Sequence, residues 1–205
     1  MNNPRRDSPS YHRNIEPITS KLHELIPKDN IRILEIGSGS GQHVAYFSKE
    51  FPQATFLPTD YEEENLASIN AWTHGQENIL PAQQLDAKKL NWFGDNMEQT
   101  EKFDVLLCFN VIHITPWEVT QSIFNGANKV MNEKCQILFY GPFRIKGKQT
   151  SESNADFEKW LKAKDMSFGV RDIDDVKREA KVHGFDLVQS HPMPGNNFIN
   201  AFART

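Results

Sequence analysis

The fold of this chain is decided by residues 31–42, which read IRILEIGSGSGQ. The apolar run at 31–36 predicts a buried strand, and the glycines at 37, 39 and 41 predict a tight turn that opens a helix. Glycine adopts backbone angles closed to other residues and puts no side chain between the turn and a ligand. A helix that starts here points free N–H groups at that ligand. The stretch therefore indicates a site for a nucleotide-type cofactor.

The spacing of the glycines separates two kinds of cofactor. A dinucleotide site needs its third glycine one position later, where this chain has Gln42. In addition, the carboxylate of Glu35 would repel the phosphates of a dinucleotide. An acidic residue followed by three alternating glycines suits a cationic cofactor that carries no phosphate. S-adenosylmethionine meets both conditions, so we expect it here and disfavour a nicotinamide-dependent oxidoreductase.

Three later strands are predicted to end in polar residues at the same sheet edge. They are 54–59 followed by Asp60, 79–85 followed by Asp86 and Ala87, and 103–109 followed by Asn110. Asp60 lies 19 residues beyond Gly41, close to the about 20 expected for the acidic partner of a ribose. Asp86 can accept from an adenine amino group while the N–H of Ala87 donates to the ring. The expected cofactor-binding residues are Glu35, Gly37, Ser38, Gly39, Gly41, Asp60, Tyr61, Asp86, Ala87 and Asn110.

From the glycine motif through Asp60 and Asp86 to Asn110, the chain resembles the class I S-adenosylmethionine-dependent methyltransferases. Further motifs resemble an uncharacterised methyltransferase-like family, held as a domain of unknown function, with bacterial and eukaryotic members. They are SP at 8–9, RN at 13–14, EPI at 16–18, GQH at 41–43, IHI at 112–114, PW at 116–117, YGPF at 140–143, GVRD at 169–172 and MPGNN at 193–197. The family usually has alanine where this chain has Gly195. The resemblance covers nearly the whole chain and implies fold and cofactor, but no substrate.

The implied fold is α/β and Rossmann-like, a mostly parallel seven-stranded sheet with a C-terminal antiparallel hairpin and helices on both faces. Sequence patterns predict a fifth strand at 135–140, a terminal hairpin at 185–188 and 198–202, and helices at 62–72, 117–130 and 173–183. Residues 1–27 are expected to form a tail, extended over 1–14, and a docking helix. Residues 144–172 form a long polar interval that interrupts the alternation of strands and helices. This interval either covers the substrate or is a structural excursion.

Composition agrees with a single domain over residues 1–205. No apolar run approaches a membrane span and no hydrophobic region follows the N-terminus, so a cytoplasmic protein is expected. A net charge of -4, with no basic run beyond Arg5 and Arg6, argues against a large nucleic-acid footprint, although transfer RNA stays open. Cys108 and Cys135 are expected as small core residues, and no metal is expected.

Methyl transfer is an in-line displacement that needs alignment and exclusion of water, with a general base only where the acceptor must lose a proton early. His113, just past the fourth strand, is the candidate base, and a structural histidine is the alternative. Tyr140, at the end of the fifth strand, either donates its hydroxyl to a substrate or packs. His43 is expected as a helix-packing residue.

The acceptor is expected above the ends of the fourth and fifth strands, against Asn110, His113, Trp117 and Tyr140. Aromatic walls with few polar groups favour a small, partly apolar acceptor, either a small molecule or a protein side chain. The expected substrate residues are Arg13, Asn14, Trp117, Asn154, Arg171 and Asn196. The alternative function is a cofactor-binding protein without catalysis that acts through partners.

Overall fold

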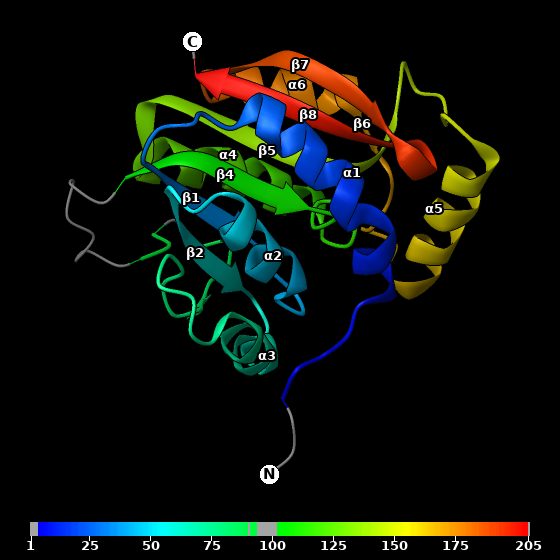
Figure 1. Cartoon of the computed structure of the whole chain (residues 1–205). Helices are drawn as coiled ribbons and strands as arrows, with labels where there is room; N and C mark the ends of the chain where they lie inside the picture. Colours follow the sequence, from blue (N-terminus) through cyan, green and yellow to red (C-terminus); the bar gives the residue numbers. More distant parts are fainter. Residues whose placement is uncertain (1–3, 90, 94–101, 205) are drawn as a thin grey trace.

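A computed structural model describes residues 4–89, 91–93 and 102–204 of the chain. Its centre is an eight-stranded sheet in the order β3-β2-β1-β4-β5-β8-β7, with β6 paired to β5 off this path (Figure 1). The strands are β1 (Ile31–Ile36), β2 (Ala54–Asp60), β3 (Gln83–Gln84), β4 (Phe103–Phe109), β5 (Met131–Arg144), β6 (Arg171–Asp172), β7 (Phe185–Met193) and β8 (Asn197–Arg204). Pairing is parallel except for β8, which runs antiparallel to β5 and β7. The predicted mostly parallel sheet with a C-terminal antiparallel hairpin is confirmed, and β6 is an addition to it.

Helices cover both faces of this sheet (Figure 1). They are α1 (Pro9–Leu25), α2 (Gln42–Glu50), α3 (Glu63–Thr73), α4 (Trp117–Val130), α5 (Glu152–Lys164) and α6 (Ile173–Val182), with a short 3-10 turn at Pro194–Asn196. Successive strand residues face opposite sides, so Ile33 packs with the core under α1 and α2, and Leu34 with the core under α4 and α6. The sheet thus separates two hydrophobic cores. Among the described residues, no helix has the length and apolar character that crossing a membrane requires.

The third strand is much shorter than the predicted 79–85. Phe56 on β2 accepts from Leu80 N–H and donates to the carbonyl of Asn78, at 2.8 and 2.9 Å. Two residues further along β2, Pro58 has no N–H to offer to the same side, and on the opposing segment the N–H of Ala82 donates to the Asn70 side chain at 2.9 Å. The ladder therefore breaks, and regular pairing resumes only at β3.

Two further expectations need correction. The segment expected to be extended over 1–14 becomes helical at Pro9, because Ser8 and Pro9 form a favourable helix start with proline in the first turn. The interval 144–172 holds a complete helix, α5, and the short strand β6. Helix α5 begins at Ser151, whose side chain accepts from the N–H of Asn154.

Trp92 connects the segment after β3 to α4. Its indole N–H donates to the carbonyl of Ala87 at 3.2 Å. Its ring lies against Gly126, in the middle of α4, where an added Cβ would come within 2.2 Å of the indole. The absence of a side chain at this helical glycine therefore makes the close contact possible.

We expect Gly41→Ala to destabilise the protein more than Gly75→Ala. Both glycines have positive φ, +86° and +82°, so both substitutions carry a backbone cost of about 1 kcal/mol. Only at Gly41 would the new Cβ also come within 2.5 Å of the Ile69 Cα, whereas Gly75 faces open space. This clash should add about 1 to 3 kcal/mol. Urea unfolding of both variants measures the difference, and equal losses would contradict it.

Candidate functional site

The loop between β1 and α2 is held by the end of β2. The N–H groups of Gly37 and Ser38 both donate to the carbonyl of Thr59 at 2.9 Å. Gly37 and Gly39 have positive φ, +73° and +57°. A Cβ on Gly37 would lie 2.4 Å from the Val111 side chain, whereas a Cβ on Gly39 would meet nothing within 4 Å. Gly39 therefore leaves its backbone open to a ligand.

A cavity of about 450 Å³ lies beside this loop, at the carboxyl ends of β1, β2 and β4. Seven of the ten residues expected to bind the cofactor line it, namely Gly37, Gly39, Asp60, Tyr61, Asp86, Ala87 and Asn110. Ser38 and Gly41 belong to the loop, and Glu35 lies on β1 just before it, but these three do not line the cavity. The carboxyl ends of parallel strands are where open α/β sheets bind ligands, so this cavity is the candidate site.

The Asp60 carboxylate accepts three hydrogen bonds at the edge of the cavity. Asp60 is 6% exposed. One carboxylate oxygen accepts from the N–H of Gly39 at 2.8 Å. The other accepts from the N–H of Glu62 at 3.0 Å and from the Asn65 amide at 2.9 Å. The carboxylate therefore fixes the loop and the start of α3 at the same point.

The opposite wall follows β3. The Asp86 carboxylate is half-buried and accepts from the N–H of Lys88 at 3.0 Å. Ala87 is held through its carbonyl by Trp92.

Asn110, at the end of β4, has a φ of +61° and donates its N–H to the carbonyl of Tyr140 at 2.8 Å. Asparagine tolerates this left-handed conformation better than most residues, so the chain turns sharply at the edge of the cavity.

Glu35 is buried beneath the glycine loop. It is 3% exposed, and its Oε2 has no hydrogen-bond partner among the described residues. Burial, together with the nearby charge of Asp60, raises the pKa of Glu35 to about 7. A carboxyl group without a full set of partners is costly when ionised in such surroundings. Glu35 therefore changes charge near neutral pH.

His113 lies deeper than expected for a residue that contacts substrate. It is 1% exposed, and its ring packs edge-on against Phe143. Nδ1 accepts from the N–H of Arg171 at 3.4 Å. Nε2 has no partner among the described residues and faces Gly141, whose added Cβ would lie 2.5 Å away. Burial and the charge of Arg171 lower the pKa of His113 to about 3, so it is neutral and weakly basic at pH 7.

Tyr140 and His43 are packed side chains. Tyr140 is 2% exposed, and its hydroxyl accepts from the Asn197 amide at 3.0 Å. Burial raises the pKa of Tyr140 to about 12. The His43 ring lies among those of Tyr11, Phe47 and Phe109, and burial lowers its pKa to about 4.

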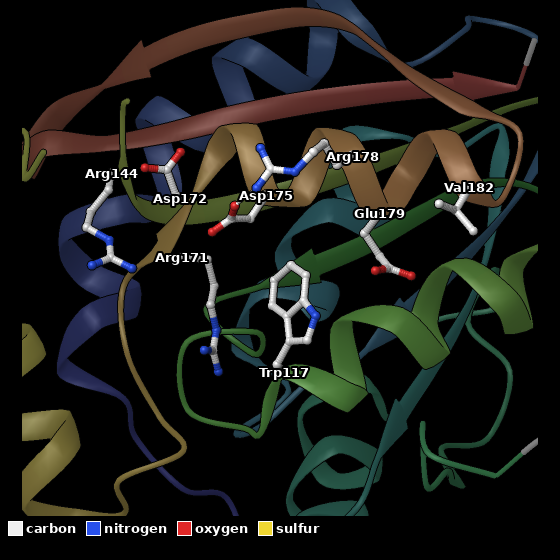
Figure 2. A pocket seen from close by; sticks show the side chains of 8 residues that line it. All are labelled: Trp117, Arg144, Arg171, Asp172, Asp175, Arg178, Glu179 and Val182. Carbon is white, nitrogen blue, oxygen red and sulfur yellow. Dashed lines mark hydrogen bonds and ion pairs between the residues drawn. The ribbon is translucent and has the colours of Figure 1, made fainter. Parts of the chain in front are cut away.

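Trp117 and Arg171 face a second cleft, of about 470 Å³, that runs along α6 (Figure 2). The Arg171 guanidinium donates to the carbonyls of Ile112, at 2.8 Å, and of Thr115. A third bond joins it to the carbonyl of Ser167 at 2.9 Å. In this arrangement Arg171 clamps the loop between β4 and α4.

The other expected substrate residues lie elsewhere. Arg13 is exposed and Asn14 is half-buried on α1. The Asn154 amide donates to the carbonyl of Asn196 at 2.9 Å and so joins α5 to the turn before β8. The structure therefore does not gather the predicted acceptor residues around one cavity: Asn110 lines the first, Trp117 the second, and His113 and Tyr140 are buried. Their roles toward an acceptor stay predictions.

Asn65, in the first turn of α3, contacts Asp60 and is a lining residue that sequence reasoning did not single out. Phe168 reaches the cavity from the segment before β6, within the interval 144–172 that was expected to hold a possible cover for the substrate. Asn65 stands in no recognisable motif. The position of Asn65 on the helix that directly follows Asp60 is the signal that would have found it.

Comparison with known proteins places the fold. A family model described as "Protein of unknown function (DUF938)" matches residues 5–204. Similar solved structures include the pyocyanin biosynthetic protein PhzM, with 13% identity, a TM-score of 0.69, and coverage of 92% of this chain and 55% of that one. An O-methyltransferase family protein from Burkholderia thailandensis has 13% identity, a TM-score of 0.74, and coverage of 93% and 56%.

A third similar structure is the magnesium protoporphyrin IX methyltransferase of Synechocystis PCC 6803, which contains bound SAH. It has 10% identity, a TM-score of 0.68, and coverage of 93% of this chain and 82% of that one. The chain spans little more than half the length of the other two proteins. At these identities the likeness shows the fold, which is that of methyltransferases.

The buried Glu35 predicts an unusual pH dependence of stability. Because its pKa is raised from 4.5 to about 7 in the folded chain, the native state binds a proton more tightly than the unfolded state, so stability falls as the pH rises between these values. Glu35→Gln mimics the neutral acid and should be the more stable protein, by a margin that reaches about 3 kcal/mol above pH 7.

Urea unfolding of wild type and Glu35→Gln from pH 5 to pH 8 measures this margin. His43 and His113, whose pKa values are lowered to about 4 and about 3, destabilise both proteins below about pH 6.5. Their effect therefore cancels in the comparison. A margin that stays constant across this pH range would show that Glu35 does not titrate as described.

Proposed function

The chain belongs to the DUF938 family, whose description assigns no function, and we propose from its site that it is an S-adenosylmethionine-dependent methyltransferase. The observation that carries the proposal is the cavity beside the glycine loop, where Gly39, Asp60 and Asp86 meet. We further propose that the acceptor is a small molecule or a protein side chain.

The open loop and the charge of the cavity support this cofactor. The open backbone of Gly39 leaves room beside the loop. Asp60 can accept from a ribose hydroxyl, and Asp86 can accept from the adenine amino group. The charged residues of the lining are Asp60, Glu62, Asp86 and Lys88. This acidic balance suits a cation and disfavours the pyrophosphate of a nicotinamide dinucleotide.

When bound, S-adenosylmethionine supplies an electrophilic methyl group on a sulfonium sulfur. The chain's own residues would hold the ligand at the carboxyl ends of the strands, where the apolar side chains of Phe109, Ile114 and Phe168 line the same cavity. His113 is neutral and faces Gly141. The proposal therefore favours an acceptor that needs no early deprotonation over one that depends on His113 as base.

One observation favours the alternative, a protein that binds the cofactor without catalysis. The side chains expected to contact an acceptor do not surround a common cavity in the described structure. Calorimetric titration with S-adenosylmethionine, its demethylated product and NAD tests the cofactor: we expect the first two to bind and NAD not to bind. Labelled methyl transfer into metabolite or protein extracts supports the methyltransferase, and binding without transfer supports the alternative.

Asp60→Ala should weaken S-adenosylmethionine binding at least about tenfold, because a charge-assisted hydrogen bond to the ribose would be lost. Glu63→Ala is the matched control, since Glu63 is an exposed acid on the same surface and does not line this cavity. Calorimetry measures both affinities, and circular dichroism checks that both variants are folded. Unchanged affinity in folded Asp60→Ala would place the ribose elsewhere.

A further inference from the structure

The segment before α1 lies against the cofactor site. The N–H of Arg6 donates to the hydroxyl of Ser68 at 2.9 Å, and that hydroxyl donates to the carbonyl of Ser40 in the glycine loop at 2.7 Å. The indole N–H of Trp72 donates to the carbonyl of Arg6 at 2.9 Å. Two residues of α3 thus hold the backbone of Arg6.

Gln42 holds the same segment from the other side. It is 3% exposed. Its side-chain oxygen accepts from the N–H of Ser8 at 2.7 Å, and its amide nitrogen donates to the Asp7 carboxylate at 2.9 Å. The residue that replaces the third glycine of a dinucleotide motif therefore anchors residues 7 and 8 at the first turn of α2.

The side chain of Arg6 reaches the cofactor cavity through Asn65. Its guanidinium donates to Asn65 Oδ1, and Asn65 Nδ2 donates to the Asp60 carboxylate at 2.9 Å. An arginine can only donate and a carboxylate can only accept, so these two neighbours leave one orientation for the amide between them. The amide oxygen of Asn65 is thereby fixed on the side of Arg6.

Asp60 alone is short of acceptor capacity for a ribose. A carboxylate offers about four lone-pair sites. Three of them already accept from protein donors on Gly39, Glu62 and Asn65. About one site is left for two ribose hydroxyls. Asn65 also lines the cavity, and its amide oxygen has a second lone pair beside the bond from Arg6.

We propose that Asn65 shares recognition of the cofactor's ribose with Asp60, and that Arg6 is a positioning residue that orients Asn65 for this contact. The inference rests on the proposed function, because it takes an adenosine cofactor as the ligand. Asn65 and Arg6, which both lie outside the glycine motif, then contribute to selection of the cofactor. The segment before α1 contributes to cofactor binding through Arg6.

The test is a double-mutant cycle on binding of S-adenosylhomocysteine, measured by calorimetry on the full chain. Asn65→Ala should weaken binding about tenfold and Arg6→Ala about fivefold. The double variant should bind no more weakly than Asn65→Ala alone, because Arg6 acts through Asn65. Arg5→Ala is the matched control: Arg5 donates to the carbonyl of Ala71 and lies over Trp72, and its loss should change affinity less than about twofold.

A second readout separates contact with the ribose from a merely structural role. The 2′-deoxy and 3′-deoxy forms of S-adenosylhomocysteine each lack one hydroxyl. For the form that lacks the hydroxyl bound by Asn65, wild type, Arg6→Ala and Asn65→Ala should bind with equal affinity. Equal weakening of all three ligands in the variants, or additive losses in the double variant, would overturn the inference.

The outcomes for the two proposals differ. Normal binding by wild type with unchanged affinity in Arg6→Ala and Asn65→Ala overturns this inference alone. Failure of wild type to bind S-adenosylhomocysteine overturns the proposed function and this inference with it. Because Arg6 is exposed, its variant is expected to fold, and Arg6→Lys, which keeps a donor, should recover part of the lost affinity.

Discussion

The cofactor end of the molecule depends on the junction between the last residues of β1 and β2. Ile36 pairs with Thr59 in parallel register, and the Thr59 carbonyl then accepts two N–H groups from the turn that follows β1. The Thr59 hydroxyl donates back to the carbonyl of Glu35 at 2.7 Å. These bonds bend the chain so that the N–H of Gly39 reaches Asp60. This turn needs a positive φ at residue 37, which glycine adopts without strain and a residue with a side chain would not.

The sequence predicts regular elements well where an apolar pattern is interrupted by clear start and stop residues. Strand β4 and helix α4 have the predicted bounds, since apolar residues fill the strand and Pro116 precedes the helix. Helix α5 was missed because its buried face includes Asn154 and Glu158, so it shows no apolar stripe. The shortening of β3 follows from Pro58 on the neighbouring strand, a pairing partner that local patterns do not reveal.

The site residues divide in the same way, into those that local sequence patterns predict and those whose role depends on how distant segments pack. Asp60 is predicted by its distance from the glycine motif, and Asp86 by its place after a predicted strand, where it can accept from an adenine amino group; both line the cavity. The contact of Asn65 with Asp60 is local and could have been inferred from the position of Asn65 in the next helix, but its bond to Arg6, 59 positions away in sequence, could not. The burial of His113 was equally hidden: it results from Gly141 on β5 and from the loop before β6, and sequence spacing alone cannot show how these segments pack.

The contact between Trp92 and Gly126 has a consequence for the speed of ligand exchange. Trp92 fastens Ala87 on one side of the cavity to the middle of α4, and the first turn of the same helix supplies Val119 to the lining. Both walls around the expected adenine are therefore attached to one rigid element. A slot preformed in this way loses little chain entropy on binding, and affinity differences among variants of one site lie mostly in the dissociation rate. Substitutions along α4, outside the cavity itself, would then tune the dissociation rate.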